Sequence, residues 1–65
     1  MQIVLNGEPI ATGASNLAEL CADLGFGDAK VATAVNGAFV AAAKRHLTPL
    51  GPQDEVEIVA PRQGG

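Results

Sequence analysis

The sequence predicts a small α+β domain in which one helix covers one face of a β-sheet. Two Asn-Gly pairs, at residues 6–7 and 36–37, each stand between short runs of strand-forming residues. Residues 16–25 carry apolar side chains at helical spacing, and residues 55–59 alternate as Glu-Val-Glu-Ile-Val. A single helix with an apolar stripe must bury it against a sheet, and this favours a two-layer α+β architecture.

Length and composition limit the possible functions. The chain has 65 residues, a formal net charge of −3 and only four Lys and Arg residues, which argues against nucleic acid and membrane as partners. A ligand pocket needs about 300 Å³, and a domain this small has little room for one, so we do not expect an enzyme.

No apolar run approaches the roughly 20 residues that span a bilayer, the N-terminus lacks a signal-peptide pattern, and the single cysteine fits a reducing compartment. We expect a cytoplasmic protein.

The first elements in the chain form a hairpin. Residues 2–5 are a short apolar run, and the Asn-Gly pair that follows suits a type I′ turn because both residues tolerate positive φ. Residues 8–12 are then the returning strand, with Ile10 directed inward. Pro9 lacks an N–H group, so this strand is expected at a sheet edge.

The helix is the clearest element of the sequence. Asn16 at the N-cap with Glu19 three residues later is a variant of the capping box. Gly25 is placed to end the helix in the left-handed conformation. The positions predicted to form its apolar face are Leu17, Leu20, Cys21 and Leu24.

A second hairpin follows the helix. Residues 31–35 are β-branched at every second position and predict a strand, and residues 38–40 return from the second Asn-Gly pair. The sequence does not decide the conformation of residues 41–47, because three alanines favour helix but the stretch is short and Pro49 stops it.

The last strand precedes a short tail. Residues 51–54 form a turn, and residues 55–59 are predicted as a strand with Val56 and Ile58 on one face. The first and last strands are the most apolar, so we expect them to pair in the centre of the sheet. Pro61 ends the last strand. We therefore expect residues 1–60 to form the domain and residues 61–65, the C-terminal tail, to be flexible.

This arrangement and this ending resemble the β-grasp family, whose best-known member is ubiquitin. The similar features are the opening Met-Gln-Ile with its early hairpin and the six-residue tail after the last strand, which ends in Gly-Gly. The segments VATAVNGAFV and DEVEIVAPRQGG most closely resemble the ThiS family of sulfur carriers in thiamine (thiazole) biosynthesis. The resemblance implies a ubiquitin-like β-grasp fold, with a mixed four- to five-stranded sheet and one main helix packed on one face.

The same resemblance implies the chemistry of the C-terminus. An E1-like adenylyltransferase (ThiF-like) uses ATP and Mg²⁺ to convert the Gly65 carboxylate to an acyl-adenylate. A relay fed by a sulfur donor, such as a cysteine desulfurase, replaces AMP and leaves a thiocarboxylate. A thiazole synthase (ThiG-like) then takes that sulfur. The chain itself binds no cofactor in this scheme and serves as a protein co-substrate.

The tail residues suit this chemistry. Gly65 has no Cβ, so nucleophiles can approach its carbonyl from either face, and Gly64 lets the backbone pass through a narrow channel. At about 3.3–3.6 Å per residue, the four residues after Pro61 reach roughly 13 Å beyond the domain. Arg62 either pairs with an acid in the partner's channel or is an ordinary tail charge. The alternative is that the two glycines are a frayed end without a function.

Other side chains have two interpretations each. Cys21 is either a nucleophile or, as free Cys more often is, a small core residue, and His46 lacks neighbours for a metal site. The acids Asp54, Glu55 and Glu57 either solubilise the surface or, with Glu57 in particular, face a basic patch on a partner. A possible docking surface next to the tail consists of Val4, Val40 and Val59, expected on the outer face of the sheet; scattered exposed valines are the alternative.

Three further functions compete with the sulfur carrier of thiazole formation. The small sulfur-donating subunit of molybdopterin synthase has a similar fold and tail. A ubiquitin-like modifier would form isopeptide bonds with lysines. A plain interaction module would make no use of its glycines.

Overall fold

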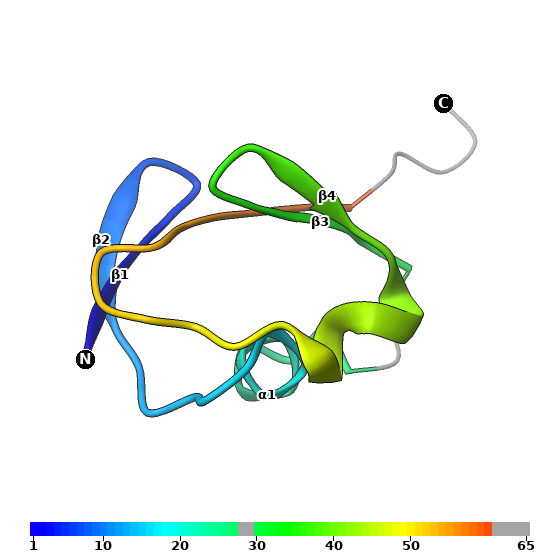
Figure 1. Ribbon diagram of the computed structural model, residues 1–65, viewed down its shortest axis with the longest axis horizontal. Coiled ribbons are helices and arrows are strands. Elements are labelled where there is room, and N and C mark those ends of the chain that lie inside the picture. The colour runs from blue at the N-terminus through cyan, green and yellow to red at the C-terminus, as the bar shows by residue number, and fades with distance from the viewer. Residues whose placement is uncertain (28–29, 61–65) are drawn as a thin grey trace.

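Five strands and one α-helix form the two layers of the protein in a computed structural model, which describes residues 1–27 and 30–60 (Figure 1). The strand order is β2-β1-β5-β3-β4. β1 (Gln2–Leu5) and β5 (Glu55–Val59) are parallel neighbours, as the apolar character of the first and last strands predicts, and β5 is the central strand. All other pairings are antiparallel, so the sheet is mixed.

Both Asn-Gly pairs form the predicted turns. Asn6 and Gly7 have φ values of 50° and 85°, and Asn36 and Gly37 have 50° and 84°. Positive φ at both central positions is the requirement of a type I′ turn. Both hairpins therefore have two-residue loops, which fix the register of the strands that they connect.

The strands agree with the sequence to within one residue. β2 (Glu8–Ala11) ends one residue earlier than predicted, and β3 (Ala32–Val35) begins one residue later. β4 is Ala38–Val40, as predicted. β2 lies at an edge of the sheet, as Pro9 predicts, because an edge strand needs N–H donors on one side only.

Helix α1 (Leu17–Asp23) begins at the predicted cap. Asn16 Oδ1 accepts a hydrogen bond from the N–H of Glu19 at 2.9 Å. The Glu19 carboxylate reaches back to Ser15, one residue before the N-cap, where it accepts from the backbone N–H at 2.8 Å and from the hydroxyl at 2.9 Å. The N-terminus of α1 is thus capped by two side chains, in a modified form of the predicted capping box.

The helix ends in a reversal that corrects one prediction. Gly25 has φ +88°, and the N–H groups of Gly25 and Phe26 donate to the carbonyls of Ala22 and Cys21, which is the Schellman arrangement. Leu24 is the C-cap and is 38% exposed, so the prediction that it extends the apolar face is wrong. The reversal at Gly25 instead lets Phe26 pack against the core.

The segment that the sequence leaves open is a 3₁₀ helix, η1 (Ala42–Leu47). It contacts α1 and lies on the same side of the sheet as α1 (Figure 1). Between this layer and the sheet lies the core, which consists of Ile3, Ala14, Leu17, Leu20, Cys21, Leu50, Val56 and Ile58. Within the described residues, no helix has the length and apolar character needed to cross a membrane.

Candidate functional site

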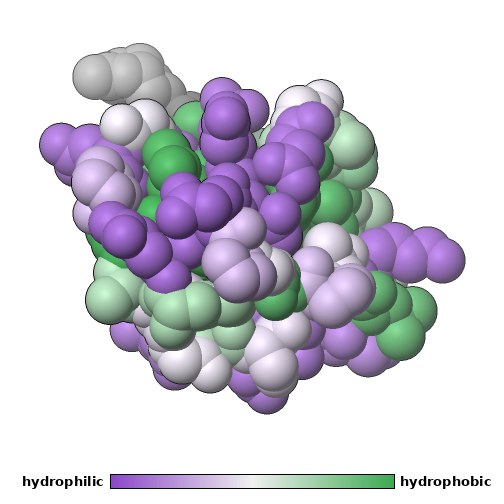
Figure 2. All heavy atoms as spheres, turned by 60° about the vertical axis from the view of Figure 1, so that its left-hand side comes forward, coloured by the Kyte–Doolittle hydropathy of each residue, from purple (hydrophilic) through white to green (hydrophobic). Residues whose placement is uncertain are grey.

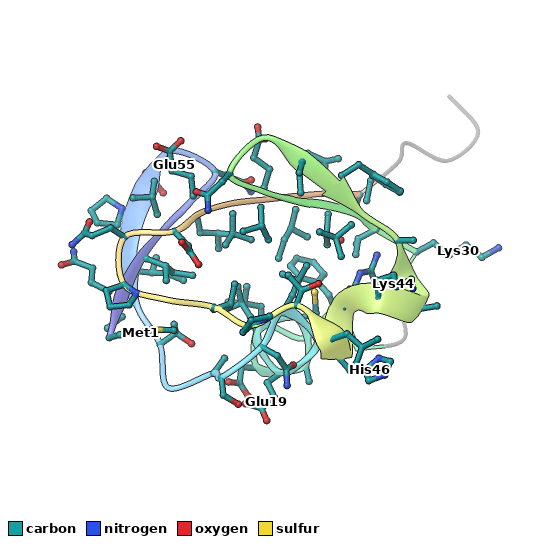
Figure 3. The ribbon with its side chains drawn as sticks, viewed as in Figure 1. Met1, Glu19, Lys30, Lys44, His46 and Glu55 are labelled. Atoms are coloured by element: carbon teal, nitrogen blue, oxygen red, sulfur yellow. The ribbon has the colours of Figure 1, made fainter. Side chains whose placement is uncertain are left out.

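The face of the sheet that points away from α1 carries the candidate site. Side chains alternate along each strand, so the buried Val56 and Ile58 point to the core while Glu55, Glu57 and Val59 point outward. Glu55 projects on the side of the sheet opposite α1 (Figure 3). This outer face has no second layer among the described residues, and it contains the strand that leads into the tail.

An apolar hollow lies on this outer face next to the end of β5. Phe39 of β4 and Val59 of β5 are 73% and 59% exposed, the first of these being the most exposed large hydrophobic side chain of the described residues. The register aligns Phe39 with Ala34, and Ala34 with Glu57, in one row across three strands. The hollow measures about 180 Å³, and its lining comprises Ala32, Thr33, Ala34, Phe39, Glu57 and Val59.

Val40 does not belong to this face, and the expectation that it lies there is wrong. Val40 is paired with Thr33, which is 2% exposed, and it packs against the core. Phe39, its neighbour in the chain, takes the outward position. The signal was present in the sequence: a two-residue turn at Asn36-Gly37 pairs Val35 with Ala38, and counting back from that pair places Val40 opposite Thr33, on the inner face.

A polar groove adjoins the apolar hollow. It measures about 280 Å³, lies between the two hairpin turns, and is lined by Val4, Gly7, Gly37, Glu55, Val56 and Glu57. Glu57 lines both the groove and the hollow. The surface with the β1–β2 side brought forward is mostly polar, with hydrophobic residues in small separate patches (Figure 2). The outer face therefore combines an acidic end with an apolar end.

Asp54, the third acid of the group, has a structural role. Its carboxylate accepts hydrogen bonds from the N–H of Gly51 at 2.7 Å and from Nδ2 of Asn36 at 3.2 Å. These two donors, the Gly51 N–H foremost, hold the pKa of Asp54 below its ordinary value. Asp54 thus closes the turn before β5, while Glu55 and Glu57 are exposed on the outer face.

Cys21 and His46 lie away from this face. Cys21 is buried in the core, as predicted, and burial raises the pKa of its thiol, opposed in part by the positive charge of Arg45. A buried thiol with a raised pKa is a poor nucleophile. His46 is exposed on η1 (Figure 3). Among the described residues, no three His, Cys, Asp or Glu side chains are grouped as a metal site would require.

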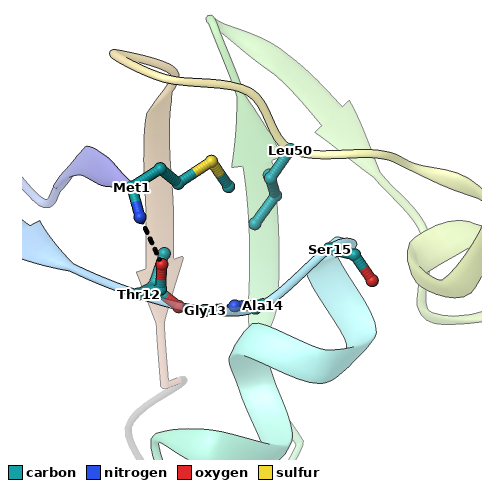
Figure 4. A pocket seen from close by; sticks show the side chains of 6 residues that line it. All are labelled: Met1, Thr12, Gly13, Ala14, Ser15 and Leu50. Carbon is teal, nitrogen blue, oxygen red and sulfur yellow. Dashed lines mark hydrogen bonds between the residues drawn. The ribbon is translucent and has the colours of Figure 1, made fainter.

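A third depression lies at the N-terminal end of the sheet, near the start of α1 (Figure 4). It measures about 310 Å³ and is lined by Met1, Thr12, Gly13, Ala14, Ser15 and Leu50. The α-amino group of Met1 donates to the carbonyl of Thr12 at 2.9 Å. The lining side chains offer only hydroxyl and apolar groups, and the Met1 ammonium already donates to the Thr12 carbonyl, so we assign this depression no role in the site.

The predicted tail residues Arg62, Gly64 and Gly65 lie outside the described residues. What the structure does place is the root of the tail, Val59 and Ala60, at the end of the central strand and beside the hollow. The root of the tail therefore lies next to the exposed outer face of the sheet.

Comparison with known proteins identifies the family. The sequence model of the ThiS family matches residues 3–65. The chain belongs to the ThiS family. A solved structure, the thiamine biosynthesis protein (ThiS) from Geobacter metallireducens, is similar at a TM-score of 0.83 with 29% sequence identity, over 100% of both chains. The comparison with curated proteins found no significant match.

Membership of the ThiS family agrees with the predicted β-grasp fold and supports a role as a sulfur carrier. The ThiS family match extends through both glycines of the tail. It does not by itself identify the enzymes that act on the tail, so these belong to the proposal that follows.

Proposed function

We propose that this chain is the sulfur carrier of thiazole formation in thiamine biosynthesis. In this proposal an E1-like adenylyltransferase activates the Gly65 carboxylate with ATP and Mg²⁺, and sulfur from a donor such as a cysteine desulfurase replaces AMP. The single observation that supports it most is the ThiS family match over residues 3–65, which includes the Gly-Gly tail. The thiocarboxylate keeps the sulfur covalently attached until a thiazole synthase accepts it.

The chemistry requires activation because a carboxylate is a poor electrophile. Adenylation supplies AMP as a leaving group, and attack by the terminal sulfur of a donor persulfide on the acyl carbon expels it and leaves an acyl disulfide. A thiol reductant then cleaves the S–S bond, which releases the thiocarboxylate and forms a disulfide with the donor. The ATP and Mg²⁺ are used by the partner enzyme. The contribution of this chain is delivery of an unhindered acyl group, since glycine at the last position leaves both faces of the carbonyl open.

Docking by the folded body is needed to offset the cost of ordering the tail. Fixing four residues costs on the order of 4–8 kcal/mol, at about 1–2 kcal/mol per residue. We propose that the outer face supplies the compensating contacts, with Phe39 and Val59 as the apolar anchors beside the root of the tail. Val4, opposite Glu55 in the register, extends this surface to the groove.

The charges on the outer face indicate the chemistry of the partner's surface. Glu55 and Glu57 are both exposed there. The net charge of the whole chain is −3, so a partner with Lys or Arg side chains opposite these acids would associate faster at low salt. Arg62 would in turn face an acidic group in the channel that receives the tail.

The pathway can be tested with the thiocarboxylate form of the chain. We expect a thiazole synthase with its other substrates to remove the sulfur, so that intact mass spectrometry shows the chain returning to the carboxylate. The large subunit of molybdopterin synthase serves as the comparison. Faster sulfur removal by that subunit than by the thiazole synthase would contradict the assignment to thiazole formation.

A further inference from the structure

Near the root of the tail, the two sides of β5 have different hydrogen-bond partners. On one side, β3 pairs with β5 up to the last residue of β5, where Ala32 is paired with Val59. On the other side, β1 pairs with β5 only as far as Leu5 opposite Val56, because the chain then turns away into the first hairpin. Among the described residues, no strand continues along that side of β5.

The side chain of Asn6 takes the place of the missing strand. Its Oδ1 accepts a hydrogen bond from the N–H of Ile58 at 3.0 Å, and its Nδ2 donates to the C=O of Ile58 at 3.1 Å. The backbone N–H of Asn6 also donates to the carbonyl of Val56 at 2.9 Å. A carboxamide has the same donor and acceptor as a peptide group, so Asn6 extends the parallel ladder beyond the end of β1.

We propose that Asn6 is a positioning residue for the C-terminal tail. It binds the main chain of Ile58, two residues before Ala60 and seven before Gly65. The two bonds fix the last residues of β5 relative to the outer face, and so fix the point from which residues 61–65, at most roughly 17 Å long at about 3.3–3.6 Å per residue, must reach the enzyme's site. This inference depends on the proposed function, because it concerns the delivery of the Gly65 carboxylate to an adenylating enzyme.

The geometry of the turn explains why asparagine serves here. The turn needs a residue that tolerates φ of 50°, and glycine would meet that need equally well. Glycine has no side chain with which to bind Ile58. The structure thus assigns Asn6 two separable tasks, one in the turn and one on β5, and Asn6→Gly removes only the second.

The second hairpin provides a matched control. Asn36 has the same φ of 50° and is also followed by glycine. Its Oδ1 accepts from the N–H of Glu55 at 3.0 Å, and its Nδ2 donates to Asp54 at 3.2 Å. Asn36→Gly therefore also removes two side-chain hydrogen bonds, to Glu55 and Asp54, but these lie at the start of β5, the end farthest from the tail.

The experiment compares Asn6→Gly with Asn36→Gly in the full chain. Hydrogen exchange at the Ile58 amide reports on the root of the tail, and the urea midpoint of unfolding reports on global stability. The initial rate of thiocarboxylate formation by an E1-like enzyme, with ATP and a sulfide donor, is measured over a range of carrier concentrations. This separates kcat from the KM for the carrier.

We expect Asn6→Gly to accelerate exchange at Ile58 about tenfold relative to Asn36→Gly and to lower kcat about fivefold or more, since small misplacements of a reacting group are costly. The KM of Asn6→Gly should stay within about twofold of wild type because the outer face is retained. Asn36→Gly should keep both kcat and KM within about twofold of wild type, even where its urea midpoint falls as far as that of Asn6→Gly.

Equal losses of kcat in the two variants, or an unchanged kcat in Asn6→Gly, would overturn the positioning role. A wild-type chain that gains no sulfur would overturn the proposed function, and the positioning role with it.

Discussion

The guanidinium group of Arg45 donates a hydrogen bond from Nε to Oγ1 of Thr33 over 3.1 Å and so joins η1 to β3. The Thr33 hydroxyl donates in turn to the carbonyl of Val40 at 2.7 Å, and Arg45 Nη2 donates to the carbonyl of Val31 at 2.7 Å. Thr33 is 2% exposed, and every buried side-chain polar atom among the described residues has a hydrogen-bond partner. This network closes the side of the core between the 3₁₀ helix and the second hairpin.

We predict that Thr33→Val lowers the free energy of unfolding by about 1–3 kcal/mol, because the Arg45 Nε–H loses its partner in a partly buried site. Arg45→Lys should cost a similar amount, since an ammonium group cannot reach both acceptors with the planar fork of arginine. Urea unfolding measures both effects. Lys44→Ala, one residue away and exposed, is the control and should change stability by less than about 0.5 kcal/mol. A Thr33→Val variant as stable as wild type would contradict this account of the network.

We predict that Phe39→Ala weakens productive docking without destabilising the fold. Phe39 is 73% exposed, so its removal should change the free energy of unfolding by less than about 0.5 kcal/mol. The KM of the chain for the adenylating enzyme should rise about tenfold, equivalent to a loss of about 1.4 kcal/mol of binding energy. Steady-state kinetics with varied carrier concentration measure the effect.

Val40→Ala is the matched control for Phe39→Ala, because Val40 is the next residue but faces the core. It should lower the free energy of unfolding by about 1 kcal/mol and leave the KM within about twofold. The outer face is not the docking surface if Val40→Ala raises the KM as much as Phe39→Ala does.

The sequence predicts most of the fold because its local signals agree with one another. The two Asn-Gly turns, the Asn16 cap and the reversal at Gly25 all specify local geometry through the residues themselves. The errors arise where tertiary packing decides. Leu24 fits the helical period, but the helix ends before it, and the core space is taken by Phe26. Residues 41–47 have no strong local preference and form η1 through contacts such as that of Arg45.

The candidate site was predictable in part. Val59 follows from the alternation of residues along β5, whereas Arg62, Gly64 and Gly65 lie outside the described residues and stay predictions. Phe39 does not follow from alternation alone, because its outward position depends on the register that the second turn sets. The sequence indicates only a turn role for Asn6. Its bonds to Ile58 join residues 52 positions apart, which no local pattern in a single sequence reveals.

We predict that Cys21 resists alkylation in the folded protein. Burial raises the pKa of its thiol, so both access and the thiolate fraction are reduced near pH 8. Iodoacetamide labelling followed by mass spectrometry should be at least about tenfold slower than in urea. Labelling at the same rate in both conditions would show that Cys21 is accessible.

We predict that acid weakens the fold through Glu19 and Asp54. Hydrogen bonds from Ser15 and from Gly51, respectively, lower the pKa of these carboxyl groups in the folded state. Their contribution to stability is therefore present above their ordinary pKa values and is lost as the pH falls through the lower, folded-state values. The urea midpoint should fall between pH 6 and pH 3, and Glu19→Gln and Asp54→Asn should each reduce that fall. An unchanged pH profile in both variants would contradict these assignments.

Intact mass after incubation with an E1-like adenylyltransferase, ATP, Mg²⁺ and a sulfide donor tests the central claim most directly. The full chain should gain the mass difference between sulfur and oxygen, with the change located on Gly65 by fragmentation. Deletion of Gly65 should abolish the gain while the urea midpoint of unfolding stays unchanged. A full chain that keeps its mass, or a shortened chain that still gains sulfur, would contradict the account.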